Sequence, residues 1–235
     1  MVKYSILIPI YNEEKILQES IDQYIGKLKK LKVDFEIILS ENGSTDNTKK
    51  ILFNLKKKYK KLLKILTSNE PNYGLALKKA IISSKGKYIV CDELDLCNIN
   101  FFKSSCLLLK SKKFDIIIGS KNHYLSQDNR PFLRRFSSKV FTKILNLLFA
   151  FKGTDTHGLK AFNRKIIPYV KKVKLDKDMF TTELVLRVSN SNLSYNEIPV
   201  EIKELRETTI PLGKRVLKVL VQIVKLFFIK IKNGL

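Results

Sequence analysis

Three acids follow an apolar run in the first half of the chain. Tyr88–Cys91 is continuously apolar, and Asp92, Glu93 and Asp95 come directly after it. A short apolar run of this kind is typical of a strand buried on both faces in a parallel sheet. Ligands of open α/β sheets bind at the carboxyl ends of the strands, and carboxylates suit Mg²⁺ or Mn²⁺, which in turn bind phosphates. We therefore expect Glu93 and Asp95 to bind a divalent metal ion, which in turn binds a diphosphate. The alternative is that these acids belong to a polar loop that follows a strand and binds nothing.

Two earlier strands are also expected to end in polar segments. Apolar runs at 4–10 and 35–40 lead into polar residues, and helical apolar spacing separates the runs from one another. Alternation of strands and helices favours parallel crossovers, so these strand ends should share one rim of a sheet. We expect segments 11–13, 41–46 and 93–95 to form one site, which favours the metal hypothesis. Asn12 is expected to cap the first helix.

The composition indicates a folded protein with an anionic partner. The chain has 235 residues and 44% hydrophobic content, which excludes general disorder. Its net charge is +23, which is compatible with nucleic acid, anionic lipid or a phosphorylated substrate, although solvated lysine faces explain much of it. An odd count of 3 cysteines without a C-x-x-C spacing argues against a disulfide framework or a zinc knuckle and fits a reducing compartment.

The carboxyl-terminal residues form a distinct segment. We expect one domain over residues 1–210 and a basic amphipathic helix over 211–235. Such a helix can lie in an anionic membrane interface, pack on the domain or pair with another subunit. Charged and polar residues interrupt it, and the sequence has no apolar stretch long enough to span a bilayer. Because the first residues enter a strand at once, we expect no signal peptide. We therefore expect a protein peripheral to the cytoplasmic face of a membrane.

Several short motifs, in order, carry a family resemblance. They are LIPIYNEE at 7–14, SENGSTDNT at 40–48, NYGLAL at 72–77, ELDL at 93–96, GSK at 119–121 and DTHGLK at 155–160. Together they resemble family 2 glycosyltransferases of the GT-A fold, and within them the dolichol-phosphate (polyprenol-phosphate) mannosyltransferase-like branch. The resemblance covers about residues 4–206 and implies an α/β fold with a Rossmann-like, mostly parallel central sheet and helices on both faces.

The resemblance also implies binding residues. Glu93 and Asp95 would bind Mg²⁺ or Mn²⁺ and the diphosphate of a nucleotide sugar. The other nucleotide-sugar residues it implies are Pro9, Tyr11, Glu13, Glu41, Asn42 and Gly74. The chain departs from the family pattern at three places. Glu93 replaces an aspartate, and Glu41 and Asn42 replace an aspartate pair. Cys97 replaces a glutamine, and its thiol is a soft ligand that matches Mg²⁺ poorly.

The activity implied is metal-assisted, inverting transfer of a hexose, mannose or glucose, from a GDP- or UDP-sugar to polyprenyl (dolichyl) phosphate. A lipid phosphate is already ionised and requires no strong base, whereas a sugar hydroxyl would require a carboxylate base. The residues expected to take part in catalysis are Asp95, which binds the metal, and the arginines Arg134, Arg135 and Arg206. Arg206 and one of Arg134 and Arg135 are expected to bind the acceptor phosphate. The arginines could instead be surface residues or pair with nearby acids.

Three other candidates receive supporting roles. Asp155 could position a loop or serve as a base, and we favour the structural role. We expect His157 to be a loop residue and not a catalyst, and Glu183 to orient an arginine. One alternative function keeps the fold and uses a glycan or other hydroxyl acceptor. A remote alternative is a non-catalytic basic module for nucleic acid or membranes; because no recognition motif accompanies the charge, we expect no nucleic-acid partner. The sequence does not indicate an oligomeric state.

Overall fold

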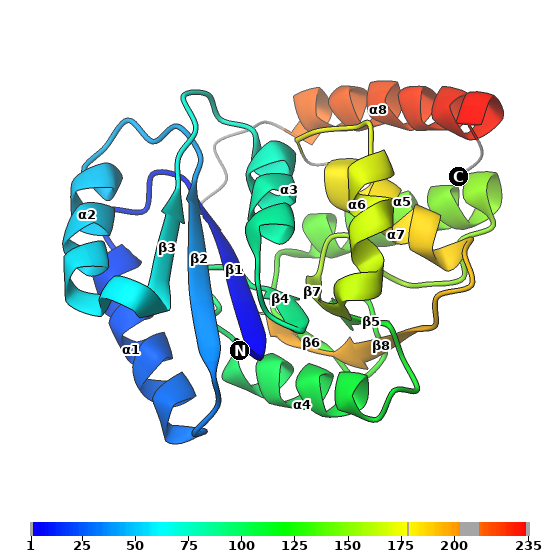
Figure 1. Cartoon of the computed structure of the whole chain (residues 1–235). Coiled ribbons are helices and arrows are strands. Elements are labelled where there is room, and N and C mark those ends of the chain that lie inside the picture. The colour runs from blue at the N-terminus through cyan, green and yellow to red at the C-terminus, as the bar shows by residue number, and fades with distance from the viewer. Residues whose placement is uncertain (1, 178, 203–211, 234–235) are drawn as a thin grey trace.

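The protein is built around one mixed β-sheet, described here from a computed structural model (Figure 1). The structure describes residues 2–177, 179–202 and 212–233, without the side chains of 212–219 and 233. In chain order the strands of the main sheet are β1 (Tyr4–Ile10), β2 (Phe35–Glu41), β3 (Leu63–Leu66), β4 (Tyr88–Cys91), β5 (Ile116–Ser120), β7 (Leu159–Asn163) and β8 (Tyr195–Pro199). A separate two-stranded sheet pairs β6 (Gln127–Asp128) with β9 (Glu201–Ile202).

The seven strands of the main sheet lie in the order β3-β2-β1-β4-β7-β5-β8. Every neighbouring pair is parallel except the two that involve β7, which runs antiparallel to both β4 and β5. The mostly parallel sheet expected from the sequence is therefore confirmed. Because β1 pairs with β2 on one side and with β4 on the other, the carboxyl ends of these strands lie next to each other.

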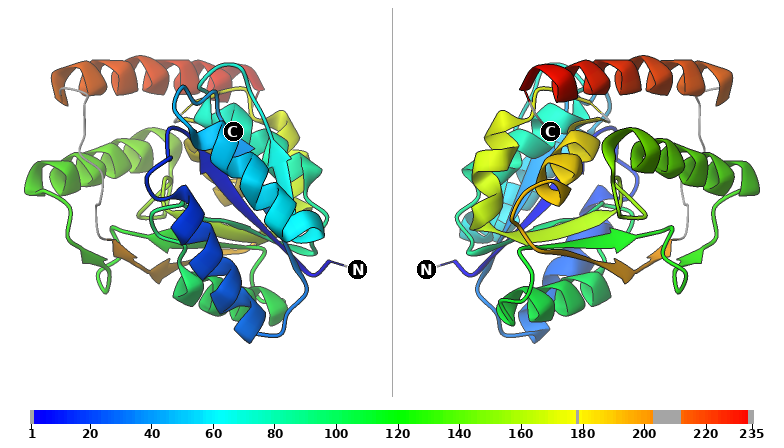
Figure 2. Two further views of the ribbon diagram at one scale, coloured as in Figure 1. Left: turned by 90° about the vertical axis from the view of Figure 1, so that its left-hand side faces the viewer. Right: turned by 90° about the vertical axis from the view of Figure 1, so that its right-hand side faces the viewer.

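Helices cover both faces of the sheet (Figures 1 and 2). One buried apolar cluster joins the sheet to α1 (Leu17–Lys30), α2 (Thr48–Tyr59) and α4 (Ile99–Lys110). A second cluster joins it to α3 (Tyr73–Ser83), α5 (Phe132–Phe149), α6 (Ile167–Lys172), α7 (Met179–Ser189) and α8 (Leu212–Asn233). Burial of this apolar area on each face is the main force that holds the layers together.

One local expectation needs correction. Asn12 is not the N-cap of α1, which begins at Leu17; Asn12 has a left-handed φ of 53° and its side-chain oxygen accepts a hydrogen bond from the Thr45 backbone N–H (2.9 Å). Strand β7 lies in the middle of the sheet, between β4 and β5. Its placement decides which residues face β4 across the candidate site.

The last helix, α8, packs beside α5 (Figure 2). Ile223 and Leu226 are buried in the second apolar cluster, and Lys230 Nζ donates to the carbonyl oxygen of Leu148 (2.8 Å). Within the described part of the chain, no helix is both long and apolar enough to cross a membrane. One face of α8 therefore packs on the domain, and its contact with a membrane or with another subunit stays a prediction.

Two glycines provide a matched test of the packing. A Cβ at Gly158, just before β7, would lie 1.9 Å from the carbonyl oxygen of Gly119 on β5, whereas a Cβ at the exposed Gly26 in α1 would meet nothing within 4 Å. We predict that Gly158→Ala lowers the free energy of unfolding by more than about 2 kcal/mol, since backbone must shift. Gly26→Ala should raise it by up to about 1 kcal/mol through helix propensity. Urea unfolding measures both; a tolerated Gly158→Ala would contradict the strand spacing.

Candidate functional site

The polar loops that follow β1 and β2 are joined by hydrogen bonds. The Asn12 N–H donates to Ser44 Oγ (3.0 Å), and the Glu13 N–H donates to Thr48 Oγ1 (2.8 Å). The third predicted segment follows β4, where the Asp92 N–H donates to the carbonyl oxygen of Leu7 in β1 (2.9 Å). The rim expected from the sequence is thus present, and it brings three distant parts of the chain together.

The residues expected to bind the nucleotide lie along this rim. Pro9 is half-buried in β1 opposite Ser40, and the Tyr11 side chain is 44% exposed just beyond the strand. Glu41 is fully buried at the end of β2. One of its carboxylate oxygens accepts from the Ser44 N–H, and the other has no hydrogen-bond partner among the described residues. An unsatisfied buried carboxylate oxygen is costly, so this position favours a ligand that donates a hydrogen bond.

Asn42 and Gly74 have structural partners. Asn42 Oδ1 accepts from the Asn72 N–H (2.6 Å), which connects the β2 loop to the start of α3. A Cβ at Gly74 would lie 2.5 Å from Cβ of Phe180 and 2.7 Å from the Lys177 carbonyl oxygen. The glycine is therefore required for close packing of α3 against the segment that leads into α7. A direct contact of Gly74 with a nucleotide stays a prediction.

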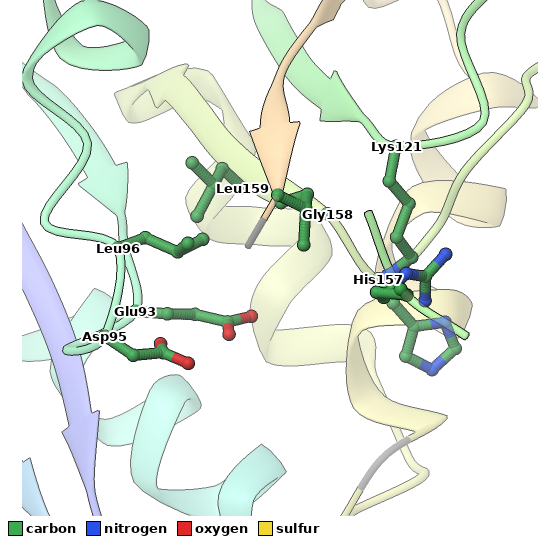
Figure 3. A pocket seen from close by; sticks show the side chains of 9 residues that line it. Glu93, Asp95, Leu96, Lys121, His157, Gly158 and Leu159 are labelled. Atoms are coloured by element: carbon green, nitrogen blue, oxygen red, sulfur yellow. The ribbon is translucent and has the colours of Figure 1, made fainter. Parts of the chain in front are cut away.

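A cavity of about 180 Å³ opens where the β4 loop faces the start of β7 (Figure 3). Glu93 and Asp95 lie on one side of it, and Lys121 and His157 lie on the other. The full lining comprises Glu93, Asp95, Leu96, Lys121, Arg130, His157, Gly158, Leu159 and Ile202. An acidic wall thus faces a basic wall, an arrangement suited to a ligand that carries both a metal-bound diphosphate and a second anionic group.

Asp155 anchors the basic wall. Its carboxylate accepts from the His157 N–H (2.8 Å) and the Lys121 N–H (3.2 Å), and it lies 3.7 Å from Lys121 Nζ. Burial acts to raise the pKa of Asp155, but Lys121 and the other donors outweigh it, so the pKa lies below its usual value. The carboxylate is ionised and fully engaged, which agrees with the loop-positioning role expected for it.

A buried lysine lies behind the cavity. Lys160 is 2% exposed in β7, and its Nζ donates to the Gly158 carbonyl oxygen (2.6 Å). Burial lowers the pKa of Lys160 to about 8, although the nearby Asp155 opposes this shift. At neutral pH the group is mostly protonated, so it adds positive potential beneath the basic wall.

The arginines divide into two groups. Arg130, which the sequence did not single out, reaches the cavity while its guanidinium forms a fork with Asp128 (2.7 and 2.8 Å). Arg134 and Arg135 lie in the first turn of α5 and are not part of the cavity lining. Arg135 is exposed and its Nη1 is 3.5 Å from the Asp128 carbonyl oxygen. Their role with the acceptor stays a prediction, and Arg206 lies outside the described residues.

The cavity includes basic residues that sequence reasoning did not assign to it. His157 was expected to be an ordinary loop residue, and Lys121 entered only as part of a short motif. Both line the cavity opposite Glu93: β7 inserts between β4 and β5 with His157 in the loop before it, and Lys121 follows the end of β5. A firm assignment of 159–163 as a central strand would have indicated this proximity.

The donor chemistry fits a hard divalent cation. Among the described residues, no group of three or more His, Cys, Asp or Glu side chains could hold a metal ion alone. Glu93 and Asp95 supply carboxylate oxygens, and Mg²⁺ or Mn²⁺ commonly takes its remaining ligands from a substrate phosphate and water. Cys97 does not compete: its thiol lies 3.3 Å from the Leu94 carbonyl oxygen, packs against the apolar core, and has its pKa raised by burial.

Glu183 has the orienting role expected for it. It is fully buried in α7, accepts from the Lys174 and Leu175 N–H groups, and forms an ion pair with Arg187 (2.7 Å). The interaction fixes the segment between α6 and α7, which in turn packs against Gly74. Glu183 therefore supports the rim from behind without lining the cavity.

An α/β sheet with paired carboxylates at the end of β4, facing a basic wall, places a ligand site at the carboxyl ends of parallel strands. Residues 5–169 match the family model described as Glycosyl transferase family 2, and the chain belongs to this family.

Curated relatives support the same assignment. The chain is 27% identical over 219 residues to a dolichyl-phosphate beta-glucosyltransferase of Dictyostelium discoideum, covering 86% of this chain and 66% of that protein. It is 24% identical over 221 residues to glycosyltransferase AglD of Haloferax volcanii, covering 92% of this chain and 35% of that protein. The chain thus spans less than two thirds of the length of these relatives.

Solved structures share the fold. Glucosyl-3-phosphoglycerate synthase from Mycobacterium tuberculosis, in complex with Mn²⁺, UDP and glucosyl-3-phosphoglycerate, superposes with a TM-score of 0.68 at 16% identity. The match covers 96% of this chain and 80% of that one. The chain therefore has the GT-A fold predicted from the sequence, with a mostly parallel sheet between two layers of helices.

Proposed function

We propose that this chain catalyses inverting transfer of glucose from UDP-glucose to a polyprenyl phosphate such as dolichyl phosphate. The observation that carries the proposal is the cavity in which Glu93 and Asp95 face Lys121 and His157. A sugar joined to a metal-bound diphosphate on the acidic wall would point toward an anion held on the basic wall. Similarity to dolichyl-phosphate glucosyltransferases supports the acceptor, and the fold shared with a UDP complex supports the donor.

The acids of the cavity favour a phosphate acceptor over a hydroxyl acceptor. Glu93 and Asp95 are the carboxylates among its described lining residues, and both would be occupied by Mg²⁺ or Mn²⁺. Asp155 is engaged by the backbone and by Lys121. Among the described lining residues, no carboxylate then remains to deprotonate a hydroxyl. A phosphate monoester is already anionic near neutral pH and attacks without such a base.

Each wall would contribute differently to the reaction. The metal, when bound, would neutralise charge that develops on the diphosphate leaving group. Glu93 and Asp95 would orient that diphosphate, and buried Glu41 would accept a hydrogen bond from the base or ribose through its free oxygen. Both basic residues form an ion pair, but that of Arg130 with Asp128 is shorter (2.7 Å) than that of Lys121 with Asp155 (3.7 Å). Lys121 is therefore the better candidate to bind the acceptor phosphate.

The acceptor implies contact with a membrane surface. On α8 the exposed apolar residues recur along the helix; they are Leu220, Val221, Val224, Phe227, Phe228 and Ile231. The neighbouring α5 also exposes apolar residues at helical spacing, namely Phe132, Leu133, Phe136, Val140 and Leu147. Exposed lysines such as Lys139 and Lys225 accompany them. We propose that these helices rest on an anionic bilayer, which would be the cytoplasmic leaflet.

We predict that Asp95→Asn abolishes transfer while the protein stays folded. The substitution keeps the size of the side chain and removes the charge that binds the metal, so the rate should fall by at least about a hundred-fold. The measurement is incorporation of radiolabelled glucose from UDP-glucose into lipid that partitions into organic solvent, with dolichyl phosphate and Mn²⁺.

Asp22→Asn serves as the matched control, since Asp22 pairs with Lys58 on the surface between α1 and α2. Full activity of Asp95→Asn would contradict the metal assignment. Absence of labelled lipid from the unaltered protein with UDP- or GDP-sugars would overturn the function itself, and transfer to a soluble saccharide would replace it with a hydroxyl acceptor.

A second prediction concerns the acceptor. Lys121→Gln should raise the KM for dolichyl phosphate by about ten-fold, because one charged hydrogen bond to phosphate is lost. The KM for UDP-glucose should stay the same. Lys103→Gln, on the exposed face of α4, is the control. An equal rise in both KM values would mean that Lys121 serves the donor or the fold instead.

The membrane proposal makes a third prediction. Replacing Val224 and Phe228 together with glutamate should reduce binding to vesicles of phosphatidylcholine and phosphatidylglycerol by at least about ten-fold, since apolar area no longer enters the interface. Phe53→Glu is a matched control, because Phe53 on α2 is 58% exposed and Phe228 is 57% exposed. Co-sedimentation measures the bound fraction. Equal loss with Phe53→Glu, or unchanged binding of the α8 variant, would exclude α8 as the contact.

A further inference from the structure

The acid that precedes the metal-binding pair has no place in the proposed reaction, yet its buried carboxylate accepts three hydrogen bonds. Asp92 is 2% exposed and is not among the lining residues of the cavity. Its Oδ2 accepts from the Tyr24 hydroxyl (2.6 Å) and from the Asn98 N–H (2.9 Å). Its Oδ1 accepts from the Glu93 N–H (2.8 Å). These donors come from α1, from the residue before α4, and from the acidic pair itself.

The same carboxylate therefore holds both ends of one short loop. Residues 93–98 form a turn in which the Leu96 and Cys97 N–H groups donate to the Glu93 carbonyl oxygen (3.1 and 2.9 Å). Cys97 has a left-handed φ of 37°, which closes the turn, and Asn98 then caps α4 by accepting from the Phe101 N–H (2.8 Å). Glu93 begins this loop and Asp95 lies in its middle, so the spacing of their carboxylates depends on the shape of the loop.

The direction of the Asp92 side chain separates its role from those of its neighbours. Both of its oxygens are used by donors in the protein interior, whereas the side chains of Glu93 and Asp95 reach the cavity. A third acid pointing inward adds no ligand to the metal. It does add charge-assisted hydrogen bonds, which are stronger than neutral ones and fix the geometry of the groups that donate them.

We infer that Asp92 and Tyr24 form a clamp that positions Glu93 and Asp95 for the metal and its diphosphate. The inference rests on the proposed function of the cavity and assigns a positioning role to two residues outside it. Residues that orient metal ligands from behind typically change metal affinity by about ten- to a hundred-fold when they are replaced. The hydrogen bond from the Tyr24 hydroxyl to Asp92 connects this loop to α1. Removal of that hydroxyl should therefore loosen the loop without adding bulk.

The test compares Tyr24→Phe with Tyr4→Phe. Tyr4 is as buried as Tyr24 and belongs to the same apolar cluster, but it lies at the opposite end of β1, where it pairs with Tyr88. Mn²⁺ binding is measured by electron paramagnetic resonance titration in the presence of UDP, so no turnover is needed. Tyr24→Phe should weaken Mn²⁺ binding by about ten-fold, and Tyr4→Phe should leave it unchanged.

Hydrogen–deuterium exchange of the metal-free protein supplies a second readout. Peptides that contain the Glu93 and Asn98 amides should exchange faster in Tyr24→Phe, while those from β2 and α3 stay protected. Asp92→Asn should give the same pattern more strongly, because an amide nitrogen cannot accept the hydrogen bonds that one carboxylate oxygen accepts.

The outcomes separate this inference from the function on which it rests. If the unaltered protein binds no Mn²⁺ with UDP, the proposed function fails. If it binds Mn²⁺ and Tyr24→Phe binds it equally well with unchanged exchange of the loop, the clamp is refuted. Equal weakening in Tyr24→Phe and Tyr4→Phe would also refute it, since the effect would then belong to the core as a whole. If Asp92→Asn does not fold, Tyr24→Phe alone decides.

Discussion

The parallel pairing of β1 with both β2 and β4 is the constraint on which the rest of the molecule depends. It places three loops side by side that are separated by tens of residues in the chain, and hydrogen bonds such as Asn12 to Ser44 then join them. Strand β4 fixes the position of the loop that follows it, and the hydrogen bonds of Asp92 fix the shape of that loop. Chemistry at Glu93 and Asp95 is therefore supported by the sheet, by α1 and by α4 together.

The antiparallel strand β7 supplies the opposite side of the site. By entering between β4 and β5 it brings His157 and Gly158 opposite the acids, and Lys121 follows from the end of β5. Behind this wall, the negative charge of Asp155 lies near the positive charges of Lys121 and Lys160. The separation of acidic and basic groups across one cavity gives a physical reason for a donor that carries a diphosphate and an acceptor that carries a phosphate.

Much of this arrangement could be predicted from the sequence because it depends on local patterns. Continuous apolar runs followed by polar residues identified β1, β2 and β4, their shared rim, and the acidic pair. Residues whose partners are remote could not be identified in the same way. Asp92 follows β4 as the first of three acids, and its partner Tyr24, which distinguishes its role from that of Glu93 and Asp95, lies 68 residues away. Lys160 interrupts the apolar run of β7, and only tertiary burial makes that segment a central strand.

The central claim is that Glu93 and Asp95 bind a metal–diphosphate opposite Lys121. A crystal structure of the chain with Mn²⁺ and UDP, recorded at a wavelength where manganese scatters anomalously, tests it most directly. We predict one strong anomalous peak within coordination distance of both carboxylates and of the diphosphate oxygens. Manganese bound by other side chains, or UDP bound away from the β1, β2 and β4 rim, would contradict it.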